Sequence, residues 1–435
     1  MARPTSPERA RAAAVEIVRT LRASGHVAYL AGGCVRDELL GLAPADYDVA
    51  TDATPARIRA IFPRTAEVGE AFGVVLVTIG PARGEAGVAA TVEVATFRSD
   101  GPYSDRRRPD AVTFSDARAD AQRRDFTINA LFLDPLADES HRVIDYVGGR
   151  VDLSRRVIRA VGDADQRLAE DHLRALRAVR LAARLGFEID PATAAAIRRH
   201  ASELTGVSRE RIGDEVRRML SAPTRSAAAT LLESLGLDGP VLNEPARGGT
   251  AAGGTAPVGR VLASLPPDAD YPTALAAWMI DRGGLGAGAG GGAGTGVGAV
   301  GSVSRWRAAL CLSNEERDAL RGALSAFAEL DSGRWGSLPV AGQKRAAVGD
   351  GFSRGLALLG AKDGALAAGV RARVEELAAT GLNPPPMLVG DDLIAMGMKP
   401  GPAFKGILDR VYDEQLEGRV GSREAAVELA RRLGV

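Results

Sequence analysis

The segment from residue 31 to residue 55, AGGCVRDELLGLAPADYDVATDATP, constrains this chain more than any other. The mostly apolar run 26–31 predicts a short buried strand, the glycine pair after it a turn, and residues 35–40 the first turns of a helix. A strand that leads through such a turn into a helix presents backbone N–H groups and a positive dipole end to an anion. Arg36 adds a cation at the same place. We therefore expect an anion site at this turn.

Two aspartates, Asp46 and Asp48, follow in the run DYDVA. In a strand they would point to the same face, because side chains alternate with a period of two. Two carboxylates on one face are costly unless a cation lies between them, and Mg²⁺ bridging triphosphate oxygens is the natural candidate. By itself such a pair is as often two solvated loop acids. Beside the anion site it predicts nucleotidyl transfer, with Asp46 and Asp48 as catalytic residues and metal ligands.

Four further segments follow along the chain: RRDFTINAL at 123–131, DYVGGRVDL at 145–153, EDHLRALRAVRLAARLGF at 170–187 and SRERIGDEV at 208–216. With these segments in this order after the first one, the chain resembles the class II tRNA nucleotidyltransferases of the CCA-adding type. That family also contains bacterial poly(A) polymerases. The resemblance covers residues 20–240 strongly and is weak beyond them until a tail-like segment near the C-terminus.

The resemblance implies an α+β protein with a polymerase-β-like nucleotidyltransferase head, a mixed sheet with helices, followed by all-α parts. From about residue 150 the apolar period changes to 3.6, which is typical of packed helices. We expect four domains: a catalytic head (1–150), a helical neck that binds base and RNA (151–235), a helical body (236–382) and a helical tail that binds tRNA (383–435). Within the body, the glycine-rich stretch 283–303 predicts a disordered surface insertion.

The activity that the resemblance implies is template-independent addition of CMP, CMP and AMP to the 3′ end of tRNA. CTP and ATP would be the substrates and Mg²⁺ the cofactor. Two other enzymes stay open: an A-adding member of a split CC/A pair, and a poly(A) polymerase. A loop of family-like length at 97–120 favours an enzyme that can incorporate adenosine. A non-catalytic RNA-binding module is disfavoured, because both site aspartates and an arginine stripe are intact.

The resemblance also implies roles for single residues. A third catalytic carboxylate is expected on a neighbouring strand, where Glu93 could face the two aspartates. The remaining expected residues bind the nucleotide: Gly32, Gly33, Arg36, Arg124, Asp125, Asn129, Asp171, Arg174, Arg177 and Arg180. Of these, Asp171 and Arg174 would recognise the edge of the incoming base, since a carboxylate accepts from the exocyclic amine of cytosine and adenine.

The spacing of three between Asp171, Arg174, Arg177 and Arg180 places them on one face of an expected helix. The alternative to base recognition is an ordinary salt-bridge ladder along that face, worth only ~0.2–0.5 kcal/mol per pair. Similarly, Arg124 next to Arg123 would in most proteins belong to a solvated charge cluster.

Composition sets bounds on partners and location. Lys plus Arg and Asp plus Glu both number 55, so an RNA-binding face must be a local asymmetry. Residues 150–218 supply one, with 15 Arg, no Lys and 11 acidic residues. Two cysteines exclude a disulfide framework or a thiolate metal site. The first residues carry no apolar signal core and no run is long enough to span a membrane, so we expect a cytoplasmic protein of open oligomeric state.

Overall fold

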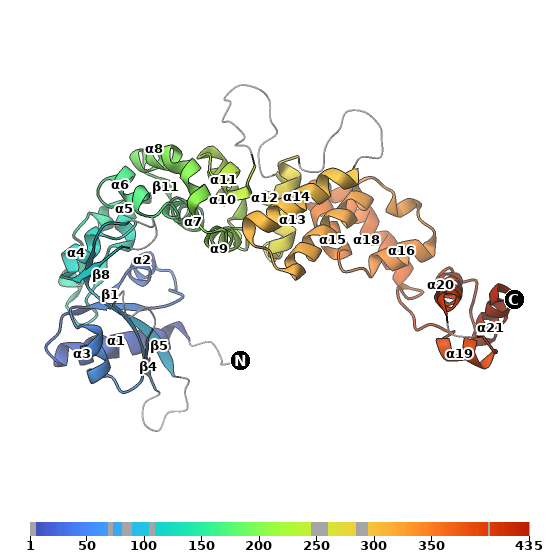
Figure 1. Ribbon diagram of the computed structural model, residues 1–435, viewed down its shortest axis with the longest axis horizontal. Helices are drawn as coiled ribbons and strands as arrows, with labels where there is room; N and C mark the ends of the chain where they lie inside the picture. Colours follow the sequence, from blue (N-terminus) through green and yellow to red (C-terminus); the bar gives the residue numbers. More distant parts are fainter. Residues whose placement is uncertain are drawn as a thin grey trace. The chain divides into compact units, whose positions relative to one another are not determined.

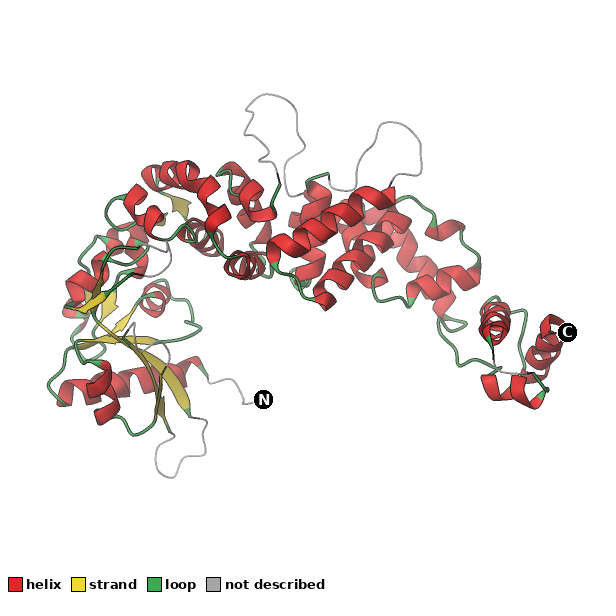
Figure 2. Cartoon of the chain, in the orientation of Figure 1, coloured by secondary structure: helices red, strands yellow, loops and turns green. Residues whose placement is uncertain are grey.

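The computed structural model describes residues 6–67, 73–80, 89–103, 109–244, 260–283, 295–398 and 401–434. The chain divides into two compact units. The first is Met1–Glu215 with Leu231–Gly249, and the second is Val216–Thr230 with Thr250–Val435. Every strand of the described residues belongs to the first unit, and helices make up the second (Figures 1 and 2).

A mixed seven-stranded sheet forms the head, in the order β3-β4-β5-β2-β1-β8-β9. Strands β2 and β5 are parallel, and the other neighbouring pairs are antiparallel. The mixed sheet predicted for the head is confirmed. Its strands are β1 (Ala28–Ala31), β2 (Asp48–Thr51), β3 (Thr65–Glu67), β4 (Val74–Ile79), β5 (Ala90–Thr96), β8 (Phe132–Leu133) and β9 (Val143–Ile144).

The two faces of the sheet differ. Helix α1 (Pro7–Ala23) packs against β1, β2 and β5 and buries an apolar stripe that includes Ile17 and Leu21. The other face carries an apolar cluster in which the rings of Phe97 and Phe132 lie 5.8 Å apart. Ala50 belongs to this cluster, so Asp48, two residues before it, projects from the same face. The sheet thereby holds a carboxylate at the end of a packed apolar surface.

Short elements around the sheet complete the head. They are α2 (Gly33–Leu39), α3 (Pro55–Ile61), the antiparallel ribbon of β6 (Arg98–Asp100) and β7 (Val112–Phe114), α4 (Ala117–Gln122), the 3₁₀ turns η2 (Thr127–Asn129) and η3 (Glu139–His141), and α5 (Gly149–Arg155). The expected loop at 97–120 therefore contains a strand pair and a helix, and its residues 104–108 lie outside the described residues.

The neck is helical, as the periodicity predicts, with one difference. A two-stranded parallel sheet joins β10 (Val157–Ile158) to β11 (Glu188–Ile189). These pairs of residues are too short for a period to show in the sequence. The neck helices are α6 (Ala164–Glu170), α7 (Arg174–Leu185), α8 (Pro191–His200), the 3₁₀ segment η4 (Ala201–Gly206), α9 (Arg209–Leu220), α10 (Arg225–Ser234) and α11 (Asp238–Leu242).

The second unit is built from helices around an apolar core, in which the rings of Trp278 and Trp306 meet edge to face at 5.3 Å. No described helix is both long and apolar enough to cross a membrane. The helices are α12 (Arg260–Ser264), α13 (Tyr271–Asp281), α14 (Thr295–Leu310), α15 (Asn314–Asp331), η5 (Trp335–Ser337), α16 (Val340–Ala347), α17 (Phe352–Lys362), α18 (Gly364–Ala378), α19 (Gly390–Ala395), α20 (Pro402–Leu416) and α21 (Arg423–Gly434).

The prediction of a disordered glycine-rich insertion at 283–303 is wrong for its second half. Residues 295–303 are the first turns of α14, and Val303 is buried. Glycine composition suggested a coil, but the helix gains packing energy from the apolar residues further along it, such as Trp306. Residues 284–294 lie outside the described residues.

The predicted tail has an apolar core of its own. Leu393 of α19, Val411 of α20 and Ala426 of α21 pack together in one cluster. The triple-proline stretch at 384–386 precedes it, and proline cannot continue a helix. The division into head, neck, body and tail otherwise stays a prediction.

The close approach of helices α15 and α17 leads to a testable prediction on thermal stability. A Cβ at Gly355 in α17 would lie 2.6 Å from Cβ of Ala326 in α15, whereas one at Gly369 in α18 would meet nothing within 4 Å. We expect Gly355→Ala to lower Tm, because overpacking costs ~1–3 kcal/mol. Gly369→Ala, the matched control, should raise it slightly through helix propensity. Equal Tm changes for the two variants, measured by thermal melting, would contradict this account of the α15–α17 contact.

Candidate active site

The glycine turn forms as predicted. Strand β1 ends at Ala31, and Gly32 follows with φ +79° and ψ −131°, a conformation that favours glycine. A Cβ at Gly32 would lie 2.9 Å from a terminal nitrogen of Arg124. Helix α2 begins at Gly33, two residues earlier than the sequence suggested. The turn thus brings backbone N–H groups and the Arg124 guanidinium to the same place.

Three carboxylates gather on the neighbouring strands. Asp48 is the first residue of β2, Asp46 lies two residues before it, and Glu93 stands opposite Asp48 in the parallel register of β2 and β5. Burial raises the pKa of Asp48 to about 7, and the nearby charges of Asp46 and Glu93 add to that rise. The expectation that Glu93 faces the aspartate pair therefore agrees with the register.

The chemistry of this donor set suits a hard divalent cation. All three groups offer carboxylate oxygens, which are the ligands such cations prefer. Burial first, and then the charges of Asp46 and Glu93, raise the pKa of Asp48 and so disfavour its ionised form, which a bound cation would favour. Asp46 and Asp48 line the adjoining cavity and would hold the ion, with Glu93 reinforcing their charge from β5.

That cavity is open to solvent, has a volume of about 750 Å³ and lies wholly within the first unit. Its wall carries nine arginines and five aspartates, so it favours a polyanion. The cavity brings together every sequence-predicted residue except Glu93. Those lining it are Gly32, Gly33, Arg36, Asp46, Asp48, Arg124, Asp125, Asn129, Asp171, Arg174, Arg177 and Arg180.

Arg124 is anchored by a residue that the sequence analysis missed. Its Nε donates to Oδ2 of Asp120 at 3.0 Å, and a terminal nitrogen donates to the carbonyl of Asn129 at 3.1 Å. Burial alone would raise the pKa of Asp120, but Arg124 and Arg123 hold it below its usual value. The solvated charge cluster considered for this arginine pair is not what forms. Asp120 instead binds both guanidiniums, and that of Arg124 lies beside the glycine turn.

A chain of polar contacts runs across the cavity floor. Arg36 donates to Oδ1 of Asn129 at 2.5 Å, and Nδ2 of Asn129 donates to Oδ1 of Asp125 at 3.0 Å. The other oxygen of Asp125 accepts from Arg177 at 2.6 Å. Burial would raise the pKa of Asp125, yet Arg177 and Asn129 lower it to about 2. Asp125 therefore stays ionised and holds Arg177 in position.

The arginine stripe differs from the expected helix face. Asp171 is not helical: it has φ −152° and ψ 105° between α6 and α7, and α7 begins at Arg174. One oxygen of Asp171 accepts from the N–H of Leu173 at 3.1 Å, which turns the chain into α7. The prediction that Asp171 shares the helix face with the arginines is thus wrong. The tight turn still points it into the same cavity.

A salt-bridge ladder along α7 does not form either. Asp171 pairs with Arg211 of α9 at 2.7 Å, and Arg180 pairs with Glu215 of the same helix at 2.6 Å. Arg174 pairs with Glu170 at the end of α6. Arg211 and Glu215 lie in the segment 208–216, which resembles the family, but the sequence pattern predicts no role for either. Each stripe residue is therefore oriented by a partner from another element.

The carboxylate cluster sets a prediction on stability. Because the folded-state pKa of Asp48 lies above the ordinary carboxyl value, its contribution to stability is present at low pH and is lost as pH rises through about 7. In metal-free buffer, Asp48→Asn should therefore raise Tm, by an amount that grows from pH 4 to pH 7 and then levels off. The gain corresponds to at most ~1.4 kcal/mol per pKa unit.

The matched control for this series is Glu16→Gln, on the exposed side of α1. It should leave the pH dependence of Tm unchanged. A wild-type Tm that rises relative to Asp48→Asn between pH 4 and pH 7 would contradict the electrostatic account.

Residues 28–159 match the family described as the poly(A) polymerase head domain, and residues 186–246 match the probable RNA and SrmB-binding site of polymerase A. The CCA-adding enzyme of Geobacillus stearothermophilus is 43% identical over 226 residues, 52% of this chain and 53% of that protein. That of Bacillus subtilis (strain 168) is 40% identical over 223 residues. The chain thus aligns with about half the length of these curated relatives.

Solved structures extend the likeness to nearly the whole chain. The crystal structure of the Bacillus stearothermophilus CCA-adding enzyme in complex with CTP matches with a TM-score of 0.72 and 30% identity, covering 97% of both chains. The Thermotoga maritima CCA-adding enzyme complexed with tRNA matches with a TM-score of 0.66 at 18% identity, which shows a common fold. On these grounds, and on the site described above, the chain belongs to the CCA-adding family of tRNA nucleotidyltransferases, whose head is shared with poly(A) polymerases.

Proposed function

We propose that this protein adds CMP, CMP and AMP to the 3′ end of tRNA, using CTP and ATP with Mg²⁺ and no nucleic-acid template. The observation that carries the proposal is the single cavity in which a carboxylate cluster, a glycine turn and an arginine-rich wall meet. The relatives named above support the choice of tRNA, CTP and ATP. A cytoplasmic location and the choice of Mg²⁺ among divalent cations are part of the same proposal.

The carboxylates serve the transfer step. Mg²⁺, when bound, would ease deprotonation of the attacking 3′-hydroxyl and neutralise charge on the leaving pyrophosphate. Asp46 and Asp48 would hold the ion, and Glu93 keeps the local potential negative from the neighbouring strand. The turn at Gly32 and Gly33 lies beside them and offers backbone N–H groups to the triphosphate.

The arginines position the rest of the nucleotide. Arg124 stands beside the glycine turn with its plane fixed by Asp120, so it is placed to donate to a phosphate or a sugar. Asn129 and Asp125 lie next to it and offer polar groups that can meet a ribose hydroxyl. Arg177 and Arg180 would hold phosphates further along the wall.

Base choice would reside in Asp171 and Arg174, which border the cavity from the turn that leads into α7. A carboxylate accepts from an exocyclic amine, and a guanidinium donates to a ring nitrogen or carbonyl. Uracil and guanine offer a different pattern and would leave buried groups unpaired, at ~1–3 kcal/mol each. The pairs with Arg211 and Glu170 pre-orient the two side chains, so less ordering is needed on binding.

The decisive test is product analysis with a tRNA that lacks its whole CCA end. With labelled CTP and ATP, we expect three nucleotides in the order C, C, A. Failure to incorporate CMP, together with AMP addition to a tRNA ending in CC, would assign the A-adding reaction. Products longer than three nucleotides would assign poly(A) synthesis. Asp46→Ala is the control: it should lower transfer by ~10³-fold or more while tRNA binding stays near wild type.

Base recognition has a separate test. Asp171→Ala removes the acceptor for the exocyclic amine, so the ratio of kcat/KM for CTP over UTP should fall by ~10- to 100-fold, because one hydrogen bond to a charged group is worth ~1.5–3 kcal/mol. The measurement is steady-state kinetics on one tRNA.

Asp163→Ala is a matched control for this variant. Asp163 caps α6 by accepting from the N–H of Gln166, so its loss should cost ~0.5–2 kcal/mol of stability and leave the ratio unchanged. If Asp171→Ala behaves in the same way, with a lower Tm and an unchanged ratio, Asp171 has a structural role only.

A further inference from the structure

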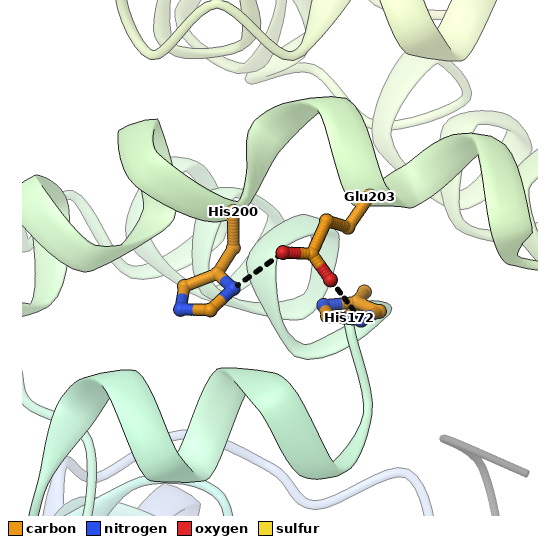
Figure 3. A group of neighbouring side chains, drawn as sticks. All are labelled: His172, His200 and Glu203. Carbon is orange, nitrogen blue, oxygen red and sulfur yellow. Dashed lines mark ion pairs between the residues drawn. The ribbon is translucent and has the colours of Figure 1, made fainter.

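A second group of polar side chains lies in the neck and does not line the cavity. His172 stands in the turn between α6 and α7, His200 ends α8, and Glu203 belongs to η4. Figure 3 shows the Glu203 carboxylate between the two imidazoles. Its Oε2 lies 3.0 Å from Nε2 of His172, and its Oε1 lies 3.3 Å from Nδ1 of His200. One ligand atom from each side chain lies within 4.8 Å of the other two.

The tautomer of His200 is set from its other side. Nε2 of His200 lies 3.3 Å from Oδ1 of Asp165, and Asp165 is held as a carboxylate by two hydrogen bonds from Arg199, at 2.9 and 2.5 Å. A carboxylate can only accept, so the proton of a neutral His200 resides on Nε2. Nδ1 then turns a lone pair toward Oε1 of Glu203, which is also an acceptor. Two acceptors at 3.3 Å repel each other, and a cation between them would remove the repulsion.

That cation could be a proton or a metal ion, and the surroundings favour the metal. The His172 side chain is only 2% exposed, and the ring nitrogens that face Glu203 are shielded from water. The two rings are stacked with their centroids 5.8 Å apart, and both lie against the Glu203 carboxylate. One divalent ion can bind all three side chains at once, whereas a proton can bridge only one imidazole and the carboxylate.

The ligand types are those of zinc. Two histidines and one glutamate, with a water in the fourth position, form a well-known tetrahedral arrangement around this ion. Glu203 is 37% exposed, which gives water a route to that position. The contact between Asp165 and His200 is also the carboxylate–histidine–metal arrangement that fixes a ligand's tautomer and raises its basicity.

We propose that His172, His200 and Glu203 bind one Zn²⁺ ion, with Asp165 positioning His200. The ion would tie the α8–η4 junction to the turn that carries Asp171. The backbone bonds of that turn include those from the Arg174 N–H to the Asp171 carbonyl at 3.0 Å and from the Ala175 N–H to the His172 carbonyl at 3.1 Å. Zinc would therefore fix the segment 171–175 without taking part in the chemistry of the cavity.

The proposal is tested on the full chain after removal of metals by a chelator. Cys311→Ser serves as the background, because Cys311 is an exposed thiol that could bind zinc. Zinc affinity is measured by competition with a chromophoric chelator. We expect the background protein to bind one equivalent of Zn²⁺. Its affinity for zinc should fall ~100-fold or more in His200→Ala and Glu203→Gln, and ~10- to 100-fold in Asp165→Asn. His141→Ala, which removes an exposed histidine of the head, is the matched control and should bind like the background.

Hydrogen exchange supplies a readout that needs no activity. Zinc should slow amide exchange at residues 171–175 in the background protein and leave it unchanged in Glu203→Gln, a variant of a partly exposed side chain that should fold. If His200→Ala and Glu203→Gln both still bind one equivalent of zinc as the background does, the proposal is overturned. A Tm that responds to pH in the histidine range but not to zinc would overturn it too, and would assign a shared proton to the cluster.

Discussion

The parallel pairing of β2 with β5 is the constraint on which the site depends. This pairing places Glu93 directly opposite Asp48, and Asp46 lies two residues before Asp48 in the chain. Three carboxylates are therefore concentrated at one face of the sheet. The pKa of Asp48, raised to about 7 by burial and by these neighbours, records the electrostatic cost. The packing of α1 on the opposite face, with its fully buried apolar stripe, supplies the rigidity that holds the charges in place. The topology of the head therefore creates the carboxylate cluster at which we propose that the cation binds.

The arginines of the cavity follow a second rule: each one that was predicted to bind the nucleotide is paired with a carboxylate, either of a nearby residue or of another element. Asp37 lies 2.7 Å from Arg36, Asp120 holds Arg124, and Asp125 holds Arg177. A guanidinium has five N–H donors, so one that is held by a carboxylate still has donors for a substrate oxygen. This arrangement lets a chain of zero net charge form a positive cavity with nine arginines against five aspartates.

The neck serves the cavity through its turns as much as through its helices. Asp171 and Arg174 border the cavity because the chain leaves α6 in an extended conformation and is turned into α7 by the bond from the Leu173 N–H to Asp171. The same turn carries His172, which lies beside Glu203 and is not among the residues that line the cavity. One short segment thus connects the proposed base-recognition residues with the proposed zinc site, and its rigidity matters to both.

The sequence by itself determined the glycine turn, the aspartate pair and the helical neck, because each is a local pattern: a turn that favours Gly32, a period of two in DYDVA, and a period of 3.6 after residue 150. Only the tertiary structure decided the partners. Asp37 accepts a hydrogen bond from Arg184, 147 residues away in the sequence, and Asp171 accepts one from Arg211, 40 residues away. No periodicity of the sequence encodes such separations. The sequence pattern did not predict the helix at 295–303 for the same reason, because packing around Trp306 and not local propensity stabilises it.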